Sequence, residues 1–194
     1  YLTYFISISE KFKIMCGIIG FVNSPNSEWN RDDLVRGLKR IKHRGPDNLG
    51  EFFTDTETVA LGHARLSIVD LSESANQPFS SNCGRYKIVF NGEIYNYKEL
   101  KSELNFDEVE LRTTSDTEIL LHYFIKYGVN GLKELNGMFA FAIYDGLEET
   151  VTLVRDRFGV KPLYYHHSKE NGLLFCSEIK GIMGFFGDVT HLNH

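Results

Sequence analysis

The sequence predicts an α+β fold in which two antiparallel sheets pack together and helices cover their outer faces. Strand-like segments are joined by short turns, which favours antiparallel pairing. Several of these segments are apolar almost throughout, as expected for strands that are covered on both faces. The helical segments stand between groups of strands and do not alternate with them one by one. A layered sandwich satisfies these three observations.

The first third of the chain predicts three strands and one helix. Residues 16–22 are nearly all apolar, which is typical of a strand buried on both faces. Asn30 can cap a helix over residues 31–42, where apolar side chains recur at helical spacing. Residues 51–54 and 58–63 have the pattern of two short strands with a turn between them.

The middle of the chain predicts a long loop, a strand and a short helix. Residues 64–84 show no clear periodicity, and ordered loops of this length often carry function. A strand over residues 86–90 is expected to end at a turn formed by Asn91 and Gly92. Residues 97–104 then predict a short helix.

The last third predicts a helix followed by two hairpins. Ser115 and Glu118 have the spacing of a capping box, and Gly128 is a fitting stop signal for the helix that follows them. Four aromatic residues of the hairpins are expected in the hydrophobic core: Phe139, Phe141, Tyr164 and Tyr165. The remaining elements are paired strands at 138–145 and 150–155, paired strands at 163–166 and 173–176, and a last helix near Ser177.

Composition indicates one globular domain and excludes several classes of protein. The chain has 194 residues, of which 42% are hydrophobic and 24% are charged, and its formal net charge is -5. No apolar run approaches the roughly 20 residues that span a bilayer, and no stripe of Lys and Arg marks a nucleic-acid surface. Three widely spaced cysteines fit neither a disulfide framework nor a zinc site. We therefore expect a cytoplasmic protein that binds neither membrane nor nucleic acid.

Cys16 is the candidate nucleophile. The sequence lacks the motifs of phosphate loops, dinucleotide sites, serine hydrolases and zinc proteases, and no metal site is expected. Met15 fits either a core position in a longer strand or the true start of the protein. If Met15 is removed, the Cys16 thiol lies beside its own α-amine, whose pKa of about 7.7–8.0 suits a general base. Cys83 and Cys176 are interpreted as incidental, and the charged turn at residues 155–157 as structural.

Nine short motifs occur in the order in which one known family carries them. They lie at residues 15–21 (MCGIIGF), 43–47 (HRGPD), 62–71 (GHARLSIVDL), 77–78 (QP), 90–96 (FNGEIYN), 115–118 (SDTE), 135–142 (LNGMFAFA), 155–164 (RDRFGVKPLY) and 177–180 (SEIK). On these motifs the chain resembles the amino-terminal glutaminase domain of the asparagine synthetase family, a class II glutamine amidotransferase with an N-terminal nucleophile. The resemblance implies a four-layer αββα sandwich of the Ntn-hydrolase type.

The resemblance assigns the chemical step to three residues. Cys16 would attack the side-chain amide of glutamine and form a γ-glutamyl thioester. Asn91 and Gly92 would form the oxyanion hole, through the Asn side-chain amide and the Gly backbone N–H. These three residues are the expected catalytic set.

The resemblance also implies how the substrate is bound. Arg65 would bind the α-carboxylate of glutamine, since a guanidinium does this with two hydrogen bonds. Glu93 and Asp116 lie in the motifs that receive the α-ammonium, and a carboxylate at position 116 also suits the start of a helix. The substrate loop continues from Arg65 through Leu66, Ser67, Ile68 and Val69.

The same resemblance divides the chain and sets its expected function. Residues 1–15 would be a leader, either an upstream extension or a propeptide, residues 16–186 the amidotransferase domain, and residues 187–194 a tail. The family's synthetase domain, which uses ATP and Mg²⁺, has no counterpart in this sequence. We expect hydrolysis of L-glutamine to glutamate and ammonia, a step without a cofactor, with the ammonia supplied to ATP-dependent asparagine synthesis from aspartate.

Two other functions are considered. One is a truncated amidotransferase module that folds without catalysis, and the other is an ammonia donor for amidation of a sugar acid in surface-polysaccharide synthesis. The expected partners are L-glutamine and an ATP-dependent synthetase domain or subunit, and a homodimer is also considered. The residue at the amino terminus of the purified protein separates the catalytic from the non-catalytic reading.

Overall fold

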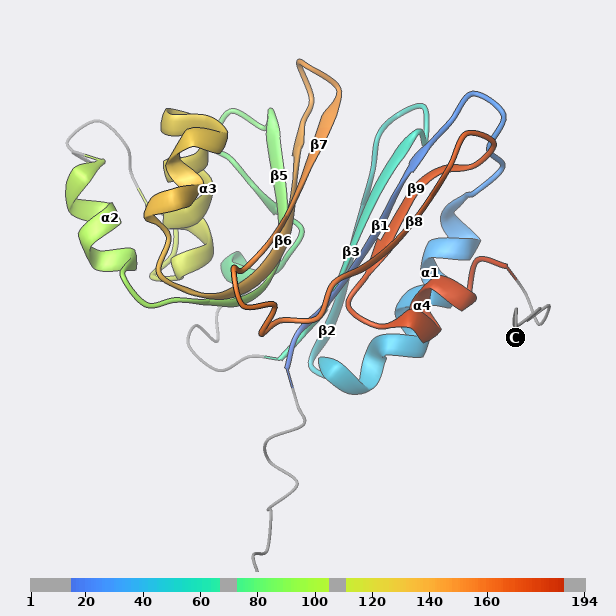
Figure 1. Cartoon of the computed structure of the whole chain (residues 1–194), viewed down its shortest axis with the longest axis horizontal. Coiled ribbons are helices and arrows are strands. Elements are labelled where there is room, and N and C mark those ends of the chain that lie inside the picture. The colour runs from blue at the N-terminus through green and yellow to red at the C-terminus, as the bar shows by residue number, and fades with distance from the viewer. Residues whose placement is uncertain (1–14, 67–72, 105–110, 187–194) are drawn as a thin grey trace, which may run out of the picture.

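The structure, a computed structural model, describes residues 15–66, 73–104 and 111–186. Its strands form two sheets, and neighbouring strands within each sheet are antiparallel. The two sheets stand side by side, with helices on the outer side of each (Figure 1). The prediction of an α+β fold built on two antiparallel sheets is therefore confirmed. The predicted tail and all of the predicted leader except Met15 lie outside the described residues.

The first sheet has five strands in the order β2-β3-β1-β9-β8, and the second has four in the order β4-β5-β6-β7. The strands of the first sheet are β1 (Gly17–Asn23), β2 (Asn48–Phe53), β3 (Val59–Arg65), β8 (Tyr164–Ser168) and β9 (Gly172–Cys176). Those of the second are β4 (Phe79–Ser80), β5 (Tyr86–Ile94), β6 (Gly137–Asp145) and β7 (Thr150–Arg155). Both predicted hairpins of the last third are present, as β6-β7 and β8-β9.

The helices complete four layers. On the outer face of the first sheet lie α1 (Arg31–Ile41) and α4 (Ile179–Met183), and on that of the second lies α3 (Asp116–Tyr127) with α2 (Tyr97–Glu103) beside it. Short 3₁₀ segments connect some of these elements: η2 (Lys42–Arg44), η3 (Glu73–Ala75) and η5 (Gly128–Glu134). The order of helix, sheet, sheet and helix is that of an αββα sandwich.

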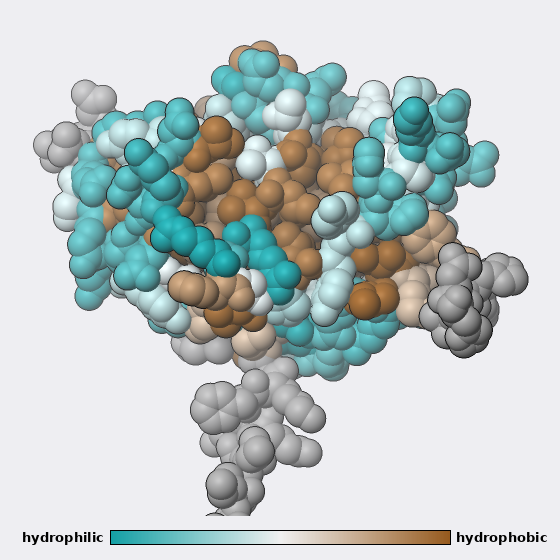
Figure 2. Space-filling model, viewed as in Figure 1, coloured by the Kyte–Doolittle hydropathy of each residue, from teal (hydrophilic) through white to brown (hydrophobic). Residues whose placement is uncertain are grey.

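Alternating side chains divide the core between the layers. Ile18 and Leu61 of the first sheet meet Val89 of the second in a buried cluster that also contains Phe175. Because successive residues of a strand point to opposite faces, Ile19 packs beneath α1 instead. Figure 2 shows hydrophobic side chains gathered over the middle of the viewed face, where strands of both sheets lie.

The start of α1 follows from its capping residue. The Asn30 side-chain oxygen accepts the backbone N–H groups of Asp32 and Asp33, and the Asp33 carboxylate accepts the Asn30 N–H at 3.1 Å. This reciprocal arrangement satisfies donors that the first turn of a helix leaves unpaired. The helix predicted over residues 31–42 is confirmed and ends one residue earlier.

The start of α3 is only partly as predicted. The Ser115 hydroxyl accepts the backbone N–H of Thr117 at 3.1 Å, which confirms Ser115 as the cap. The buried Glu118 carboxylate accepts the backbone N–H groups of Arg112 and Thr113 instead of completing a capping box. Glu118 therefore fixes the turn that leads into the helix, a role that the four-residue spacing alone does not predict.

The predicted turn at Asn91 and Gly92 is wrong, because β5 continues through both residues to Ile94. The partner strand β6 is long enough to pair with all of β5, and Gly92 lies opposite Phe139. A Cβ atom at Gly92 would come within 2.3 Å of the Met138 carbonyl oxygen. Glycine therefore allows the two strands to approach closely at this point.

The segment predicted as irregular, residues 64–84, contains ordered pieces. Strand β3 extends to Arg65, and β4 pairs with β5 through Phe79 and Ile88. With only two residues, β4 is too short to produce a recognisable alternation in the sequence. Residues 67–72 lie outside the described residues.

The expectation that four hairpin aromatics belong to the core is right for two of them. Phe139 and Phe141 are buried, whereas Tyr164 and Tyr165 are 44% and 70% exposed. Both tyrosines lie on β8, which is an edge strand of its sheet. A tyrosine at an edge can cover neighbouring side chains with its ring and keep its hydroxyl in water.

Candidate active site

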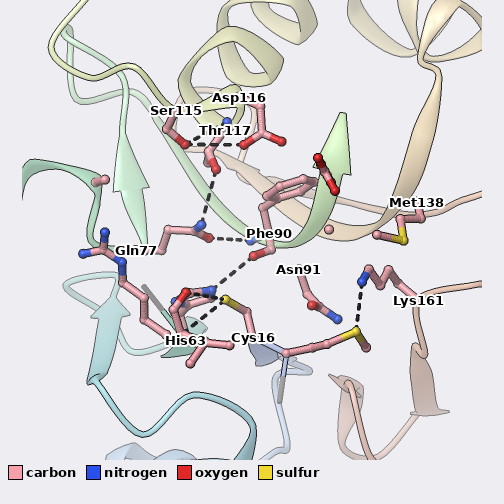
Figure 3. A pocket seen from close by; sticks show the side chains of 16 residues that line it. Cys16, His63, Gln77, Phe90, Asn91, Ser115, Asp116, Thr117, Met138 and Lys161 are labelled. Atoms are coloured by element: carbon pink, nitrogen blue, oxygen red, sulfur yellow. Dashed lines mark hydrogen bonds between the residues drawn. The ribbon is translucent and has the colours of Figure 1, made fainter. Parts of the chain in front are cut away.

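A cavity of about 330 Å³ is lined by residues from both sheets. Its walls come from the two residues before β1, the end of β3, the second half of β5 and the start of α3, as Figure 3 shows. The structure brings together every predicted site residue that it describes: Cys16, Arg65, Leu66, Asn91, Gly92, Glu93 and Asp116. The rest of the predicted substrate loop, Ser67, Ile68 and Val69, lies outside the described residues.

Cys16 stands directly before β1, and its thiol faces the backbone of Leu66. The Leu66 N–H donates to Sγ at 3.3 Å, and the Leu66 carbonyl oxygen lies 3.6 Å from Sγ. Burial raises the pKa of the Cys16 thiol above its ordinary value. The resting thiol therefore keeps its proton at neutral pH, and a nearby base is needed to turn it into a nucleophile.

Asn91 brings a hydrogen-bond donor without a partner to the same cavity. Its side chain is 1% exposed, and among the described residues its Nδ2 atom has no hydrogen-bond acceptor. A buried polar group left unpaired costs about 1–3 kcal/mol, so a ligand oxygen is the natural partner for this donor. The geometry therefore suits a side-chain amide whose Nδ2 atom donates a hydrogen bond to an oxygen atom of the substrate.

Charges of opposite sign reach the cavity from different elements. Arg65, at the end of β3, is buried and donates from Nη1 to the side-chain oxygen of Asn76. Glu93 on β5 and Asp116 in the first turn of α3 supply carboxylates. The Asp116 carboxylate is held in place because Oδ2 accepts the Ile94 N–H at 2.9 Å. A free amino acid, with one carboxylate and one ammonium group, complements this arrangement.

The electrostatic state of Asp116 also favours a cationic ligand. Burial raises the pKa of the Asp116 carboxyl, and the negative charge of Glu93 adds to this effect. An ammonium group placed between the two carboxylates would offset both effects, because its positive charge stabilises the ionised form of each. The site is therefore better satisfied with a bound α-ammonium than without one.

Comparison with known protein families identifies the family of this chain. The profile of the glutamine amidotransferase domain matches residues 15–193. The chain belongs to the glutamine amidotransferase family.

Relatives of this amidotransferase domain are larger proteins. It is 40% identical to glutamine-hydrolysing asparagine synthetase 2 of Bacillus subtilis over 87% of this chain and 22% of the relative. It is also 40% identical to amidase chry2 of Gibberella zeae, over 88% of this chain and 27% of that relative. The chain spans about a third or less of the length of the curated relatives it matches.

A solved structure agrees with the fold. Glutamine phosphoribosylpyrophosphate amidotransferase from B. subtilis superimposes with a TM-score of 0.71 over 88% of this chain and 44% of that chain. The two sequences are 24% identical, so the comparison bears on the fold alone. It supports the four-layer sandwich that the motifs imply.

Two residues of the amidotransferase site carry roles that the sequence analysis missed. The Gln77 side-chain oxygen accepts the Phe90 N–H at 2.6 Å, and His63 Nε2 donates to the Phe90 carbonyl oxygen at 3.1 Å. Together they fix the backbone immediately before Asn91. Both lie inside quoted motifs, but their partner is a backbone group of a distant strand, which a motif does not reveal. Thr117, Met138 and Lys161 also line the cavity.

His63 is not suited to act as the base. Complete burial lowers its pKa to about 4, and Nε2 is already committed to the Phe90 carbonyl. Its Nδ1 atom is buried and has no partner among the described residues. A group with so low a pKa is a weak proton acceptor at neutral pH. The α-amine of a terminal Cys16 therefore remains the best candidate for the base.

The other two cysteines lie away from the amidotransferase site. Cys83 is exposed in a turn, and Cys176 is buried beneath α1, where burial raises its pKa to about 12. Neither lines the cavity. These positions agree with the interpretation of both thiols as incidental.

A metal site and a membrane-spanning helix each place requirements on the residues of a chain. Within the described residues, no three His, Cys, Asp or Glu side chains gather as a metal ion requires. Among residues 15–66, 73–104 and 111–186, no helix has the length and apolar character needed to cross a bilayer.

Proposed function

We propose that this amidotransferase domain hydrolyses L-glutamine to glutamate and ammonia, and that an ATP-dependent synthetase domain or subunit uses the ammonia to convert aspartate to asparagine. One observation carries the first part. The Cys16 thiol lines one cavity with a guanidinium, two carboxylates and the buried Asn91 side chain, whose Nδ2 atom has no acceptor among the residues that the structure describes. A nucleophile, an oxyanion donor and sites for both ends of an amino acid are thus assembled.

Substrate binding follows from the charges. Arg65 binds the α-carboxylate of glutamine, and Glu93 with Asp116 binds its α-ammonium. The side chain of glutamine then extends toward Cys16, and its amide oxygen accepts hydrogen bonds from Asn91 Nδ2 and the backbone N–H of Gly92. Such donors stabilise the charge that develops on oxygen in the transition state.

The proposed reaction has two halves. The α-amine of Cys16 takes the thiol proton, and the sulfur attacks the amide carbon. When the C–N bond breaks, the α-ammonium returns the proton to the leaving nitrogen, so ammonia departs and a γ-glutamyl thioester remains. Water then attacks the thioester with the amine again as base. The S–C bond breaks, and glutamate and the free thiol are restored.

The destination of the ammonia rests on the relatives. Similarity to glutamine-hydrolysing asparagine synthetases supports aspartate as the final acceptor over a sugar acid. ATP and Mg²⁺ would belong to the synthetase step and not to glutamine hydrolysis. A cytoplasmic location, a homodimer and the lack of membrane or nucleic-acid binding remain predictions.

The nucleophile provides the decisive test. In protein whose amino terminus is Cys16, the Cys16→Ala substitution should reduce glutamate release to background, because no other thiol lines the described cavity. Cys83→Ala is the matched control and should leave the rate unchanged, since that side chain is exposed in a distant turn. Circular dichroism spectra that match the wild type are required of both variants, so that a loss of activity is not a loss of fold. Glutamate release from the Cys16 variant at the wild-type rate would falsify the assignment of Cys16 as the nucleophile, whereas a wild-type rate no higher than background would favour the non-catalytic alternative.

A further inference from the structure

Lys161 is a buried cation that the reaction as described leaves without a role. The residue is 5% exposed and lines the cavity. Its Nζ atom donates to the Met15 sulfur at 3.0 Å, and the described part of the chain offers it no other hydrogen-bond acceptor. A thioether is a weak acceptor. A buried ammonium whose hydrogen-bond partner is a sulfur atom is costly, and this calls for a functional explanation.

The turn that carries Lys161 is built to hold it in place. The buried Asp156 carboxylate accepts the Lys161 N–H at 2.9 Å and the Val160 N–H at 2.9 Å. Arg155 Nε donates to the Lys161 carbonyl oxygen at 2.7 Å. These bonds confirm that the charged turn at residues 155–157 is structural. Its consequence is that the Lys161 side chain is directed into the cavity (Figure 3).

The ammonium group of Lys161 contacts the side chain of the residue that precedes Cys16 in the chain. Lys161 touches Met15, the residue joined to the Cys16 nitrogen, whereas the Cys16 thiol touches Leu66. Figure 3 shows the Cys16 sulfur turned away from Lys161. Removal of Met15 takes away the acceptor of the Lys161 ammonium and creates the α-amine in the same region.

Two arginine side chains near Cys16 make hydrogen bonds of their own. Arg44 donates from Nε to the Cys16 carbonyl oxygen and from Nη1 to the Glu178 carboxylate, both at 3.0 Å. Arg65 donates to Asn76.

The carboxylates near Lys161 are also committed. Glu93 and Asp116 are the proposed partners of the substrate ammonium, and the Asp156 carboxylate is occupied by backbone N–H groups. Buried His63 is neutral at pH 7 because its pKa is about 4. Burial lowers the pKa of Lys161 itself, and the positive charge of Arg44 acts in the same direction, whereas the negative charges of the Cys16 thiolate, Glu93 and Asp156 act against this shift.

We propose, on the basis of the function proposed above, that Lys161 holds the α-amine of Cys16 in its neutral form by placing a like charge beside it. A neutral amine can accept the thiol proton, whereas an ammonium cannot. The proton then moves from sulfur to nitrogen, and the electron pair left on sulfur attacks the amide carbon. Lys161 makes no bond to the substrate. It acts only through its positive charge, which keeps the α-amine of Cys16 unprotonated.

The pH profile of glutamine hydrolysis is the first test. Lys161→Met keeps most of the side-chain volume and removes the charge. The acid limb of kcat/KM should move to higher pH by about one unit, because the α-ammonium loses a like-charged neighbour. At pH 7 the rate should fall about tenfold and recover at alkaline pH. Lys161→Arg should keep the wild-type profile. A uniform loss across all pH values would assign Lys161 a merely structural role and overturn the inference.

A second test does not depend on activity. In Cys16→Ala protein with Ala as its first residue, the α-amine is titrated by its rate of acetylation against pH. Adding Lys161→Met should raise the α-amine pKa by about one unit, and adding Lys133→Met, whose side chain is 76% exposed, should leave it unchanged. An unchanged pKa in the Lys161 variant overturns the inference. Because this measurement needs no glutamine, it decides the role of Lys161 even if the wild-type protein proves inactive.

Discussion

Asn91 and Arg65 meet the substrate at different stages, so their removal should affect different kinetic constants. Asn91→Ala should lower kcat by about 10²–10³-fold with little change in KM, because an oxyanion donor acts in the transition state. Arg65→Ala should mainly raise KM, because a hydrogen bond to a charged group far from the scissile amide contributes about 1.5–3 kcal/mol to binding. Steady-state kinetics measure both, with the exposed Arg157→Ala as control. The opposite pattern would exchange the two roles.

His63 should make the stability of the protein depend on pH. Its pKa is about 4 in the folded state, against an ordinary value of 6.5. Well above pH 6.5 His63 is neutral in both the folded and the unfolded protein, so it adds no pH dependence to the free energy of unfolding. Between pH 6.5 and 4 the unfolded chain takes up a proton that the folded protein does not, so the free energy of unfolding falls by about 3 kcal/mol.

The His63→Gln variant isolates this effect. A Gln amide can still donate to the Phe90 carbonyl, but it does not titrate. Urea unfolding at pH 7 and pH 4.5 should therefore show a smaller loss of stability in this variant than in the wild type. His167→Gln, at an exposed position, is the control and should behave as the wild type. Equal losses in the His63 variant and the wild type would mean that His63 titrates normally.

Single residues also show how far the sequence predicts the site. Cys16, Asn91 and Asp116 could be predicted because each stands in a motif whose chemistry is local. His63 and Gln77 could not be assigned a task, because each binds the backbone of Phe90, which is far away in the chain. A motif gives the residue, whereas the partner becomes visible only when the sheets are placed together.

At the scale of elements, the turn after β7 should be a main determinant of local stability. The Asp156 carboxylate accepts four backbone N–H groups, from Phe139, Phe158, Val160 and Lys161. Asp156→Asn keeps the size and turns one acceptor into a donor, so buried N–H groups lose their partner. The free energy of unfolding should fall by roughly 3 kcal/mol.

Asp55→Asn is the matched control for this substitution, since Asp55 stands in an exposed turn between β2 and β3. Urea unfolding should show little change in the control. If the two variants are equally stable, the four hydrogen bonds of Asp156 contribute little, and the turn is held by other contacts.

The sequence predicts a helix or strand well when the residues that define it lie within the element itself. α1 could be bounded to one residue because its cap and its apolar stripe lie within the helix itself. β4 and the second half of β5 could not, because they are strands only through their partners: β4 through β5, and Gly92–Ile94 through β6. Strand ends are set by pairing, which sequence periodicity does not contain.

At the scale of the whole molecule, the site depends on the contact between the two sheets. Cys16 directly precedes β1 of the first sheet and Asn91 lies on β5 of the second, while the His63 to Phe90 hydrogen bond joins β3 to β5 across the contact. Neither sheet alone contains both the nucleophile and the oxyanion donor. The distance between these two groups is therefore set by the packing of the central core, and not by any loop.

This arrangement leads to a prediction about residues 1–15. Met15 lines the cavity and contacts Lys161, so a chain that continues before Cys16 places a side chain inside the space for glutamine. Its Cys16 nitrogen is also an amide, which cannot take up the thiol proton. Protein that retains these residues should hydrolyse glutamine at least about 10²-fold more slowly than protein that begins at Cys16, since a general base contributes about 10²–10⁴-fold.

The measurement combines intact mass with glutamate release. Two preparations are compared, one that retains Tyr1 and one expressed from Met15 and processed to Cys16. A third, expressed from Met15 with Cys16→Ala, sets the background rate. If unprocessed protein that still carries Tyr1 releases glutamate as fast as the processed form, the α-amine is not the base. Another side chain around Cys16 would then have to accept the thiol proton. His63 is too weakly basic for this role, because its pKa is about 4. Lys161 also lines the cavity, but its ammonium group has no lone pair with which to accept a proton.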